Sequence, residues 1–375
     1  MLHRCCPICK LRDVDVIENI QMDVPKAYHL PDSYNIVACK NCGMVYADTA
    51  ASMEDYDWYY TNCNFYGDDS KDDNSERYQW VKSLLECYLT KQSVLLELGA
   101  GNGRFEVALK RNGYNNITGT DPSRESVERL CAAGINSYMA NIYSDVSEQE
   151  CGKYDAVFLF EVAEHLLMPQ KAIANIALLL KAGGYFMISV PDYSMIADKT
   201  NCIPNYFNLE HINYFSEASL DYLMAQFNMR RVDQKRVGED LIQVYQKTDE
   251  KIEVRKDKKT QAAVMKYLEK QKKRTVQIEN VIDKLCQEQE ELVIWGTGSF
   301  VMSLFATTIL KNCRIAGFVD NNKIKQGRKI YGYEIYTPEY LKKTKCTVLI
   351  CSMLYGNQIK TQIEEMHTDN KIIIL

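Results

Sequence analysis

The chain has 375 residues, a net charge of −5 and 46% hydrophobic residues, which is typical of a globular protein with two or three domains. This acidic balance gives no general attraction for a phosphate backbone, so nucleic acid is not an expected partner. No apolar run reaches the ~18 residues that a membrane helix needs, and MLHRCCPICK at the N-terminus lacks the apolar core of a signal peptide. We therefore expect a cytoplasmic protein in which most of the 14 cysteines are reduced thiols.

Composition and periodicity predict four parts: an N-terminal segment with an aromatic run (1–88), a central α/β domain (89–247), a charged helical linker (248–291) and a C-terminal α/β domain (292–375). The central domain contains four apolar runs with the length and composition of buried strands, at 94–99, 116–121, 154–160 and 184–190. Helical patterns lie between them, and two of these patterns end in glycine, a common helix stop. Strands that alternate with helices indicate a parallel sheet covered on both faces, so the predicted fold class is α/β.

The N-terminal segment contains two C-x-x-C pairs, CPIC and CKNC, which supply Cys6, Cys9, Cys39 and Cys42. Each pair offers two thiolates from one tight turn, and two such turns complete a tetrahedral zinc site. Because four thiolates leave no open coordination position, we expect the zinc to be structural. Cys5 could replace Cys6 as a ligand, and reduced cysteines at chance spacing are the alternative interpretation.

The aromatic run DYDWYY (55–60) shows neither helical nor strand periodicity. It could form a lid over a cofactor, stack on a base or sugar, or pack as loop aromatics against the central domain. Tyr56, Trp58 and Tyr59 are therefore candidate substrate contacts.

The stretch VLLELGAGNGRF (94–105) predicts a strand, a glycine-rich loop and a helix that begins near Arg104. Glycines let the backbone turn sharply and allow a ligand to lie against it. The spacing is E-x-G-x-G-x-G, beginning at Glu97, and it differs from the G-x-G-x-x-G of dinucleotide-binding loops. Asp121 ends the next strand, where a carboxylate can bind both hydroxyls of a ribose.

Four motifs in this order resemble those of the class I S-adenosylmethionine-dependent methyltransferases. They are ELGAGNG (97–103), TGTDPS (118–123), FEVAEHLLMP (160–169) and LLKAGGYFMISVPD (179–192). The resemblance implies that the glycine loop wraps the amino-acid end of S-adenosylmethionine, that Asp121 binds its ribose, and that later residues contact adenine and flank the sulfonium. The implied cofactor site consists of Glu97, Gly99, Ala100, Gly101, Asn102, Gly103, Asp121, Asn141, Phe160 and Glu161. An NAD-binding or purely structural Rossmann-like domain is the alternative.

The order of the parts is similar to that of a narrower group, the sugar C-methyltransferases of bacterial polysaccharide and antibiotic pathways. That group combines a zinc-binding N-terminal segment, a methyltransferase domain and a C-terminal Rossmann-like domain. The resemblance implies C-methylation of a nucleotide-linked sugar by a monomer or homodimer. The alternatives are O- or N-methylation of another small molecule, a nucleic acid methyltransferase, and a zinc-stabilised scaffold protein with a vestigial cofactor site.

The stretch NLEHINYFS (208–216) resembles the motif of that group which contains its proposed catalytic base. Glu210 and His211 align with the acid and the histidine of the motif, and Tyr214 is a weaker substrate candidate. A histidine has a suitable pKa for a base, and the adjacent carboxylate is expected to raise the pKa of His211. His165, in EVAEHL, is a third catalytic candidate. Structural hydrogen-bonding roles for these side chains are the alternative.

The segment 248–291 is rich in Lys, Glu, Gln and Asp and carries only a thin apolar stripe, which predicts one or two exposed helices. After it, VIWGTGSF (293–300) is typical of a strand, a glycine turn and a helix, and Asp320 ends the next predicted strand. This is the layout of a nucleotide-binding domain. The C-terminal domain could contact the nucleotide part of a substrate, serve as a structural or dimer contact, or bind a dinucleotide.

Overall fold

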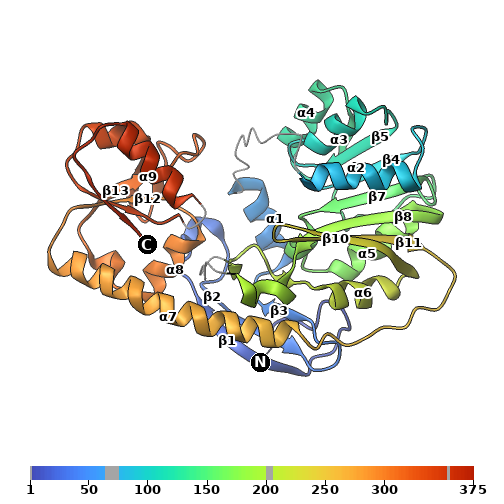
Figure 1. Ribbon diagram of the computed structural model, residues 1–375, viewed down its shortest axis with the longest axis horizontal. Helices are drawn as coiled ribbons and strands as arrows, with labels where there is room; N and C mark the ends of the chain where they lie inside the picture. The colour runs from blue at the N-terminus through green and yellow to red at the C-terminus, as the bar shows by residue number, and fades with distance from the viewer. Residues whose placement is uncertain (1, 64–75, 200–205, 353–354) are drawn as a thin grey trace.

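The computed structural model describes residues 2–63, 76–199, 206–352 and 355–375, and this part of the chain forms three sheets (Figure 1). The central sheet and its helices lie on one side of the view, the C-terminal domain lies on the other, and the long helix α7 (Thr260–Gln287) runs below both. The predicted α/β fold is confirmed. No described helix combines the length and the apolar character needed to cross a membrane.

The N-terminal sheet has four strands in the order β1-β2-β3-β9, and all three pairings are antiparallel. Three of them are consecutive: β1 (Val14–Gln21), β2 (Ser33–Cys39) and β3 (Val45–Asp48). The fourth, β9 (Asn213–Tyr214), comes from the NLEHINYFS stretch, and Tyr214 lies opposite Val45. The candidate catalytic loop is thereby joined to the cysteine-rich segment.

The aromatic run is helical, in contrast to the expected loop. Helix α1 (Met53–Asn62) begins after Ser52, whose side chain forms a capping box with Asp55. Tyr56 and Tyr59 lie three positions apart on its buried face. The cap and this packing fix the helix although the run has little apolar periodicity.

The central sheet has the order β10-β11-β8-β7-β4-β5-β6. Its parallel strands are β4 (Leu95–Leu98), β5 (Ile117–Asp121), β6 (Asn136–Met139), β7 (Tyr154–Phe160) and β8 (Leu180–Pro191). The hairpin of β10 (Met229–Val237) and β11 (Asp240–Lys247) adds two antiparallel strands next to β8. The strand order reverses between β4 and β7, and ligands of open α/β sheets bind at the carboxyl ends of the strands beside such a reversal.

The helices of this part are α2 (Glu76–Tyr88), α3 (Arg104–Arg111), α4 (Arg124–Ala132), α5 (Pro169–Leu179) and α6 (Glu217–Ala225). Helix α2 buries Val81, Leu84 and Leu85 in one core with Leu95 of β4. The central unit therefore includes α2, whereas we expected the domain boundary after it. Helix α5 ends at Leu179 rather than at the following glycines, because β8 already begins at Leu180.

The C-terminal sheet has the order β14-β15-β13-β12-β16-β17. Its strands are β12 (Leu292–Trp295), β13 (Ile315–Val319), β14 (Lys329–Ile330), β15 (Tyr333–Tyr336), β16 (Thr347–Ile350) and β17 (Lys371–Ile374), with helices α8 (Ser299–Thr307) and α9 (Gly356–Glu365). Short 3-10 turns complete the chain: η1 (Lys26–Tyr28), η2 (Ala163–His165), η3 (Tyr193–Asp198), η5 (Leu310–Asn312) and η6 (Pro338–Lys342).

The described residues of the N-terminal segment share their cores with other parts of the chain. Cys6, Ile8 and Met44 are buried in one cluster with Leu96 of the central sheet. A second cluster joins α1, β9, α7 and α8 through Tyr56, Tyr214, Tyr267 and Met302. These two shared cores fix the N-terminal segment against the carboxyl ends of the central strands.

Candidate active site and zinc centre

The four cysteines of the two C-x-x-C pairs come together. The Sγ atoms of Cys6 and Cys42 are 3.5 Å apart, those of Cys9 and Cys39 are 3.4 Å apart, and all four lie within 4.8 Å of one another. With Zn–S bonds of ~2.3 Å, a zinc tetrahedron places its sulfurs ~3.8 Å apart. The arrangement therefore fits a zinc ion, and Cys5 is not part of the group.

The surroundings of the thiols also suit a metal. The pKa of the Cys39 thiol is far below its usual value, because hydrogen bonds from Cys42 and Cys6 stabilise its thiolate. Gly43 turns the backbone after Cys42 with φ +82°, and its N–H donates to the Cys39 carbonyl oxygen at 2.9 Å. A Cβ at Gly43 would lie 2.0 Å from the Asp257 carbonyl oxygen, so the turn packs tightly against the linker.

The glycine loop follows β4 and places three backbone positions in the left-handed region. Gly99, Gly101 and Gly103 have φ of +76°, +54° and +75°, which glycine adopts without steric cost. The Gly101 N–H donates to Asp121 Oδ2 at 2.9 Å, so the loop and the end of β5 are in direct contact. A Cβ at Gly101 would meet no atom within 4 Å, so the backbone there is open to a ligand.

The acids around this loop are all buried. Burial raises the pKa of Asp121, and hydrogen bonds from the Ser123 and Gly101 N–H groups oppose the shift. Glu97 is also buried, and it influences the pKa of the buried Glu106. Burial raises the pKa of Glu106 to about 7.

The other implied cofactor residues lie around the same strand ends. Phe160 packs edge-on against Phe105 with ring centroids 5.0 Å apart. Glu161 has φ +56°, which is uncommon for a residue with a side chain, and its Oε1 accepts a hydrogen bond from Ser189 Oγ at 2.6 Å. Asn141 is exposed after β6, and its Oδ1 accepts from the Tyr143 N–H at 2.9 Å.

The three catalytic candidates meet between α1 and η2. Tyr59 Oη donates to Glu210 Oε1 at 2.5 Å, and Tyr60 Oη lies 3.1 Å from His165 Nδ1. His165 Nδ1 is also 3.0 Å from the Glu210 carbonyl oxygen. The rings of His165 and His211 are 4.8 Å apart and nearly perpendicular.

The expected rise in the pKa of His211 is wrong. Burial lowers its pKa to about 3, and His165 and Lys199 add to the shift. The Glu210 carboxylate accepts a hydrogen bond from the Tyr59 hydroxyl, although His211 is its neighbour in the sequence. Burial also lowers the pKa of His165, although Glu210 opposes that shift. Both imidazoles are therefore neutral at physiological pH.

Two of the weaker substrate candidates are structural. Tyr56 is buried and its hydroxyl donates to the Leu209 carbonyl oxygen at 2.9 Å. Tyr214 is fully buried, with ring centroids 4.7 Å from Tyr193 and 5.0 Å from Phe207. Neither side chain offers surface to a substrate. Trp58 is half-buried and stacks on the exposed ring of His29 at 4.0 Å.

Sequence reasoning missed residues that hold these groups in place. Asn213 Nδ2 donates to the carbonyl oxygens of Leu166 at 2.7 Å and Ala163 at 3.0 Å, which fixes η2 to β9. Arg4 Nη2 donates to Asn213 Oδ1 at 3.2 Å and to the Leu167 carbonyl oxygen at 3.1 Å. No local pattern marks Arg4 or Asn213. If the aromatic run had been interpreted as a helix, Tyr60 would have been a candidate site residue, because it lies four positions after Tyr56.

The glycine turn of the C-terminal domain carries a second polar group. Thr297 Oγ1 donates to Asp320 Oδ2 at 2.6 Å, and Lys325 Nζ is 3.2 Å from Thr297 Oγ1 and 3.8 Å from Asp320 Oδ2. The Tyr28 ring packs edge-on against Tyr59 of α1, with ring centroids 5.6 Å apart. Burial raises the pKa of Tyr28 to about 12, with smaller contributions from Cys63, Glu210 and Asp320, and Arg328 opposes the shift.

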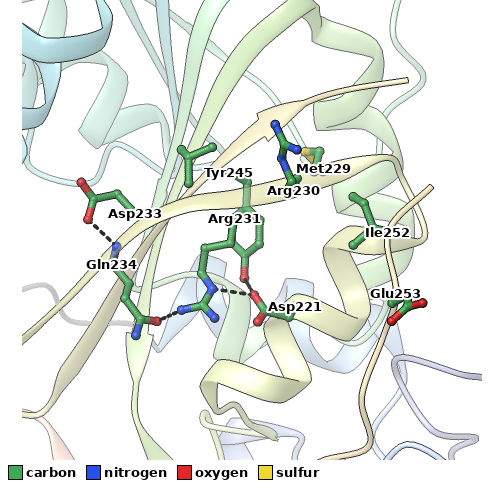
Figure 2. Close-up of a pocket in the computed structure, with 10 residues that line it drawn as sticks. Asp221, Met229, Arg230, Arg231, Asp233, Gln234, Tyr245, Ile252 and Glu253 are labelled. Carbon is green, nitrogen blue, oxygen red and sulfur yellow. Dashed lines mark hydrogen bonds and ion pairs between the residues drawn. The ribbon is translucent and has the colours of Figure 1, made fainter. Parts of the chain in front are cut away.

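A cavity of about 450 Å³ lies away from these groups, against the edge strand β10 (Figure 2). Its two arginines are paired with carboxylates. Arg231 Nε is 3.0 Å from Asp221 Oδ1, and the same oxygen accepts from Tyr245 Oη at 2.9 Å. Arg230 pairs with Glu250 at 2.6 Å. We therefore place the candidate active site at the glycine loop and not in this cavity.

Comparison with known families agrees with this placement. A model of the methyltransferase domain matches residues 74–234, which include α2, the glycine loop and η2. A second family model, described as C2185-like, N-terminal, matches residues 288–374.

Curated relatives match the same central region. Ubiquinone biosynthesis O-methyltransferase of Bordetella avium (strain 197N) is 26% identical over 121 residues, which are 31% of this chain and 49% of that protein. The protein of the same name from Shewanella pealeana is 33% identical over 100 residues, or 25% of this chain and 42% of that protein. The chain thus spans about half the length of these relatives or less.

Solved structures with a similar fold include the 1,6-didemethyltoxoflavin-N1-methyltransferase of Burkholderia thailandensis, at 19% identity and a TM-score of 0.37, over 47% of this chain and 80% of that chain. The central sheet, its glycine loop with Asp121 and the family match all describe one unit. Residues 74–234, which match the methyltransferase domain model, are thus the part of the chain that carries the glycine loop and Asp121.

Proposed function

We propose that the protein transfers a methyl group from S-adenosylmethionine to a small acceptor held between the glycine loop and the group Glu164, His165, Glu210 and His211. One contact carries this proposal. A Cβ at Gly99 would lie 2.6 Å from Val162 Cγ2, so the loop packs against the residue just before η2. A cofactor on the loop would therefore lie beside the histidines.

The residues present fit the cofactor. The loop offers an open backbone at Gly101, and Asp121 at its side has the chemistry to bind a ribose. When bound, S-adenosylmethionine supplies an already activated methyl group, so the protein must mainly align the acceptor and accept its proton.

His165 and Glu210 offer acceptor atoms for this proton, whereas the lowered pKa of His211 makes it a weak base. A carbonyl oxygen can only accept, so His165 Nδ1 donates to Glu210 O and leaves the lone pair on Nε2. His211 is neutral as well. The Glu210 carboxyl group, held by Tyr59, is a second candidate for the same task.

For the acceptor, we propose a nucleotide-linked sugar. Tyr28 supports this, because its ring packs against Tyr59, which holds Glu210, and its pKa responds to Asp320 and Arg328 of the C-terminal domain. The reacting sugar would lie at Glu210, and the nucleotide would lie at the turn of Thr297 and Lys325, where cationic side chains suit a diphosphate.

O-methylation of another small molecule is the second candidate. The observation that favours it is the match of the central region to relatives named as ubiquinone biosynthesis O-methyltransferases. The C-terminal domain would then have a structural role.

The test is a turnover screen. The protein is incubated with S-adenosylmethionine and a panel of dTDP-, GDP-, CDP- and UDP-linked keto- and hydroxy-sugars, and the gain of one methyl group is followed by mass spectrometry. A methylated keto-sugar that also exchanges its α-proton for deuterium supports C-methylation. Cofactor binding without any methylated sugar removes the sugar proposal. Absence of cofactor binding supports the vestigial-site alternative and contradicts the whole proposal.

A further inference from the structure

Three side chains beside the glycine loop have the geometry of a metal site. The ligand atoms of Glu164, His165 and His211 all lie within 4.8 Å of one another. Glu164 Oε1 is 3.9 Å from His165 Nε2. Two ligands bonded to one ion at ~2.0–2.2 Å cannot lie more than ~4.4 Å apart, so this spacing needs little adjustment.

The surroundings of His165 match those of a metal-binding histidine. Such a residue usually donates its second ring N–H to a carbonyl or carboxylate, which fixes the ring and its tautomer. His165 Nδ1 donates to the Glu210 carbonyl oxygen at 3.0 Å and lies 3.1 Å from Tyr60 Oη. Its Nε2 lone pair is thereby directed away from these partners, at the atom that faces Glu164.

The charge balance is also suitable. Glu164 is only 1% exposed, and burial of a carboxylate is costly unless hydrogen bonds or a cation compensate it. The carboxylate and the two imidazoles supply oxygen and nitrogen donors of the kind that divalent transition metal ions bind. The backbone is fixed as well, because the Ile212 N–H donates to the Glu164 carbonyl oxygen at 2.9 Å.

We propose that Glu164, His165 and His211 bind one divalent first-row transition metal ion, which holds an oxygen of the acceptor in an open coordination position. Two imidazoles and one carboxylate suit such ions, and three protein ligands leave room for substrate. This is a second metal site, distinct from the closed group of four cysteines.

The inference rests on the proposed function and deepens it. An oxygen bound to a divalent ion releases its proton more readily. The acceptor O–H bond would break with the electron pair left on oxygen, and the proton would pass to the Glu210 carboxylate, which is not one of the three ligands. For a keto acceptor, the ion would instead polarise the carbonyl oxygen.

The experiment uses Co²⁺ as the probe on the full chain with zinc in the cysteine site. After equilibrium dialysis, cobalt and zinc per chain are counted by elemental analysis. Glu164→Gln and His211→Gln remove ligands with little change in size, and His29→Asn removes an exposed histidine outside the group, at a left-handed position that Asn tolerates. We expect one Co²⁺ per wild-type and His29→Asn chain, and at least a tenfold weaker affinity in the other two variants.

Two further readouts keep the outcomes distinct. Zinc content and thermal unfolding show that each variant is folded, and the cobalt absorption spectrum of the wild type should lack the charge-transfer bands of cobalt thiolates. Wild-type protein that binds no Co²⁺, or that shows only a thiolate spectrum, overturns the inference. If methyl transfer is nevertheless observed, the metal site alone has failed; if S-adenosylmethionine does not bind by calorimetry, the proposed function has failed.

Discussion

Arg4 Nη2 donates to Asn213 Oδ1 at 3.2 Å, and this buried contact ties the cysteine-rich segment to the loop of Glu210 and His211. Arg4 also donates to the carbonyl oxygens of Ala47 at 2.9 Å and Leu167 at 3.1 Å. Asn213 in turn fixes η2 and His165 through Leu166. The cysteine-rich segment therefore supports the candidate active site through Arg4.

Arg4→Met should lower stability, because it leaves buried carbonyl oxygens without a donor. We expect a loss of about 2–4 kcal/mol in the free energy of unfolding, measured by urea titration. Arg12→Met is the matched control, since Arg12 is exposed and donates only to the Leu2 carbonyl oxygen. An equal effect of the two substitutions would show that Arg4 does not join the segments.

Cys39→Ser should abolish zinc binding and destabilise the N-terminal sheet, because β2 ends at this ligand. Cys5→Ser should retain one zinc per chain, since Cys5 lies outside the group. Zinc content and thermal unfolding with and without a chelator measure both effects. Zinc retained by Cys39→Ser but lost from Cys5→Ser would contradict the assigned ligand set.

Gly101→Ala should weaken cofactor binding more than it weakens folding. A Cβ there meets no atom within 4 Å but would enter the space proposed for the ligand. Gly152→Ala is a close control, because Gly152 has a similar φ of +64° and equally open surroundings away from the loop. Both should cost about 1 kcal/mol of stability, and only Gly101→Ala should reduce affinity for S-adenosylmethionine, by tenfold or more.

The half-buried His211 should make stability fall in acid. Its folded pKa of about 3 lies below the ordinary value, so between ~6.5 and 3 the unfolded chain binds a proton that the folded chain does not. This residue should therefore contribute a loss of about 1.4 kcal/mol per pH unit as the pH falls through that window. Compared with wild type, His211→Gln should show a shallower slope in urea titrations between pH 6.5 and 4. Identical slopes would mean that His211 is not held as a neutral ring in the folded chain.

Features that depend on local residue type could be predicted from the sequence. The left-handed backbone of Gly99, Gly101 and Gly103 has a direct signal in the glycines themselves. The cysteine group has a direct sequence signal in the two C-x-x-C pairs, because each tight turn presents two thiols.

Features that depend on long-range packing could not be predicted. Strand β9 contains only two residues, so no local sequence pattern predicts its pairing with β3. The pKa of His211 was predicted in the wrong direction because adjacent side chains point apart, and Glu210 turns to Tyr59. The strands β14 and β15 are short and polar, so no apolar run marked them.

The most direct test of the central claim is a calorimetric titration of the full chain with S-adenosylmethionine, alongside Asp121→Asn and Asp320→Asn. These two acids end equivalent strands of the two glycine-turn domains, so each variant controls for the other. We predict one binding site per wild-type chain, unchanged affinity in Asp320→Asn and a loss of at least tenfold in Asp121→Asn. Absence of binding by the wild type, or a loss confined to Asp320→Asn, would contradict the account.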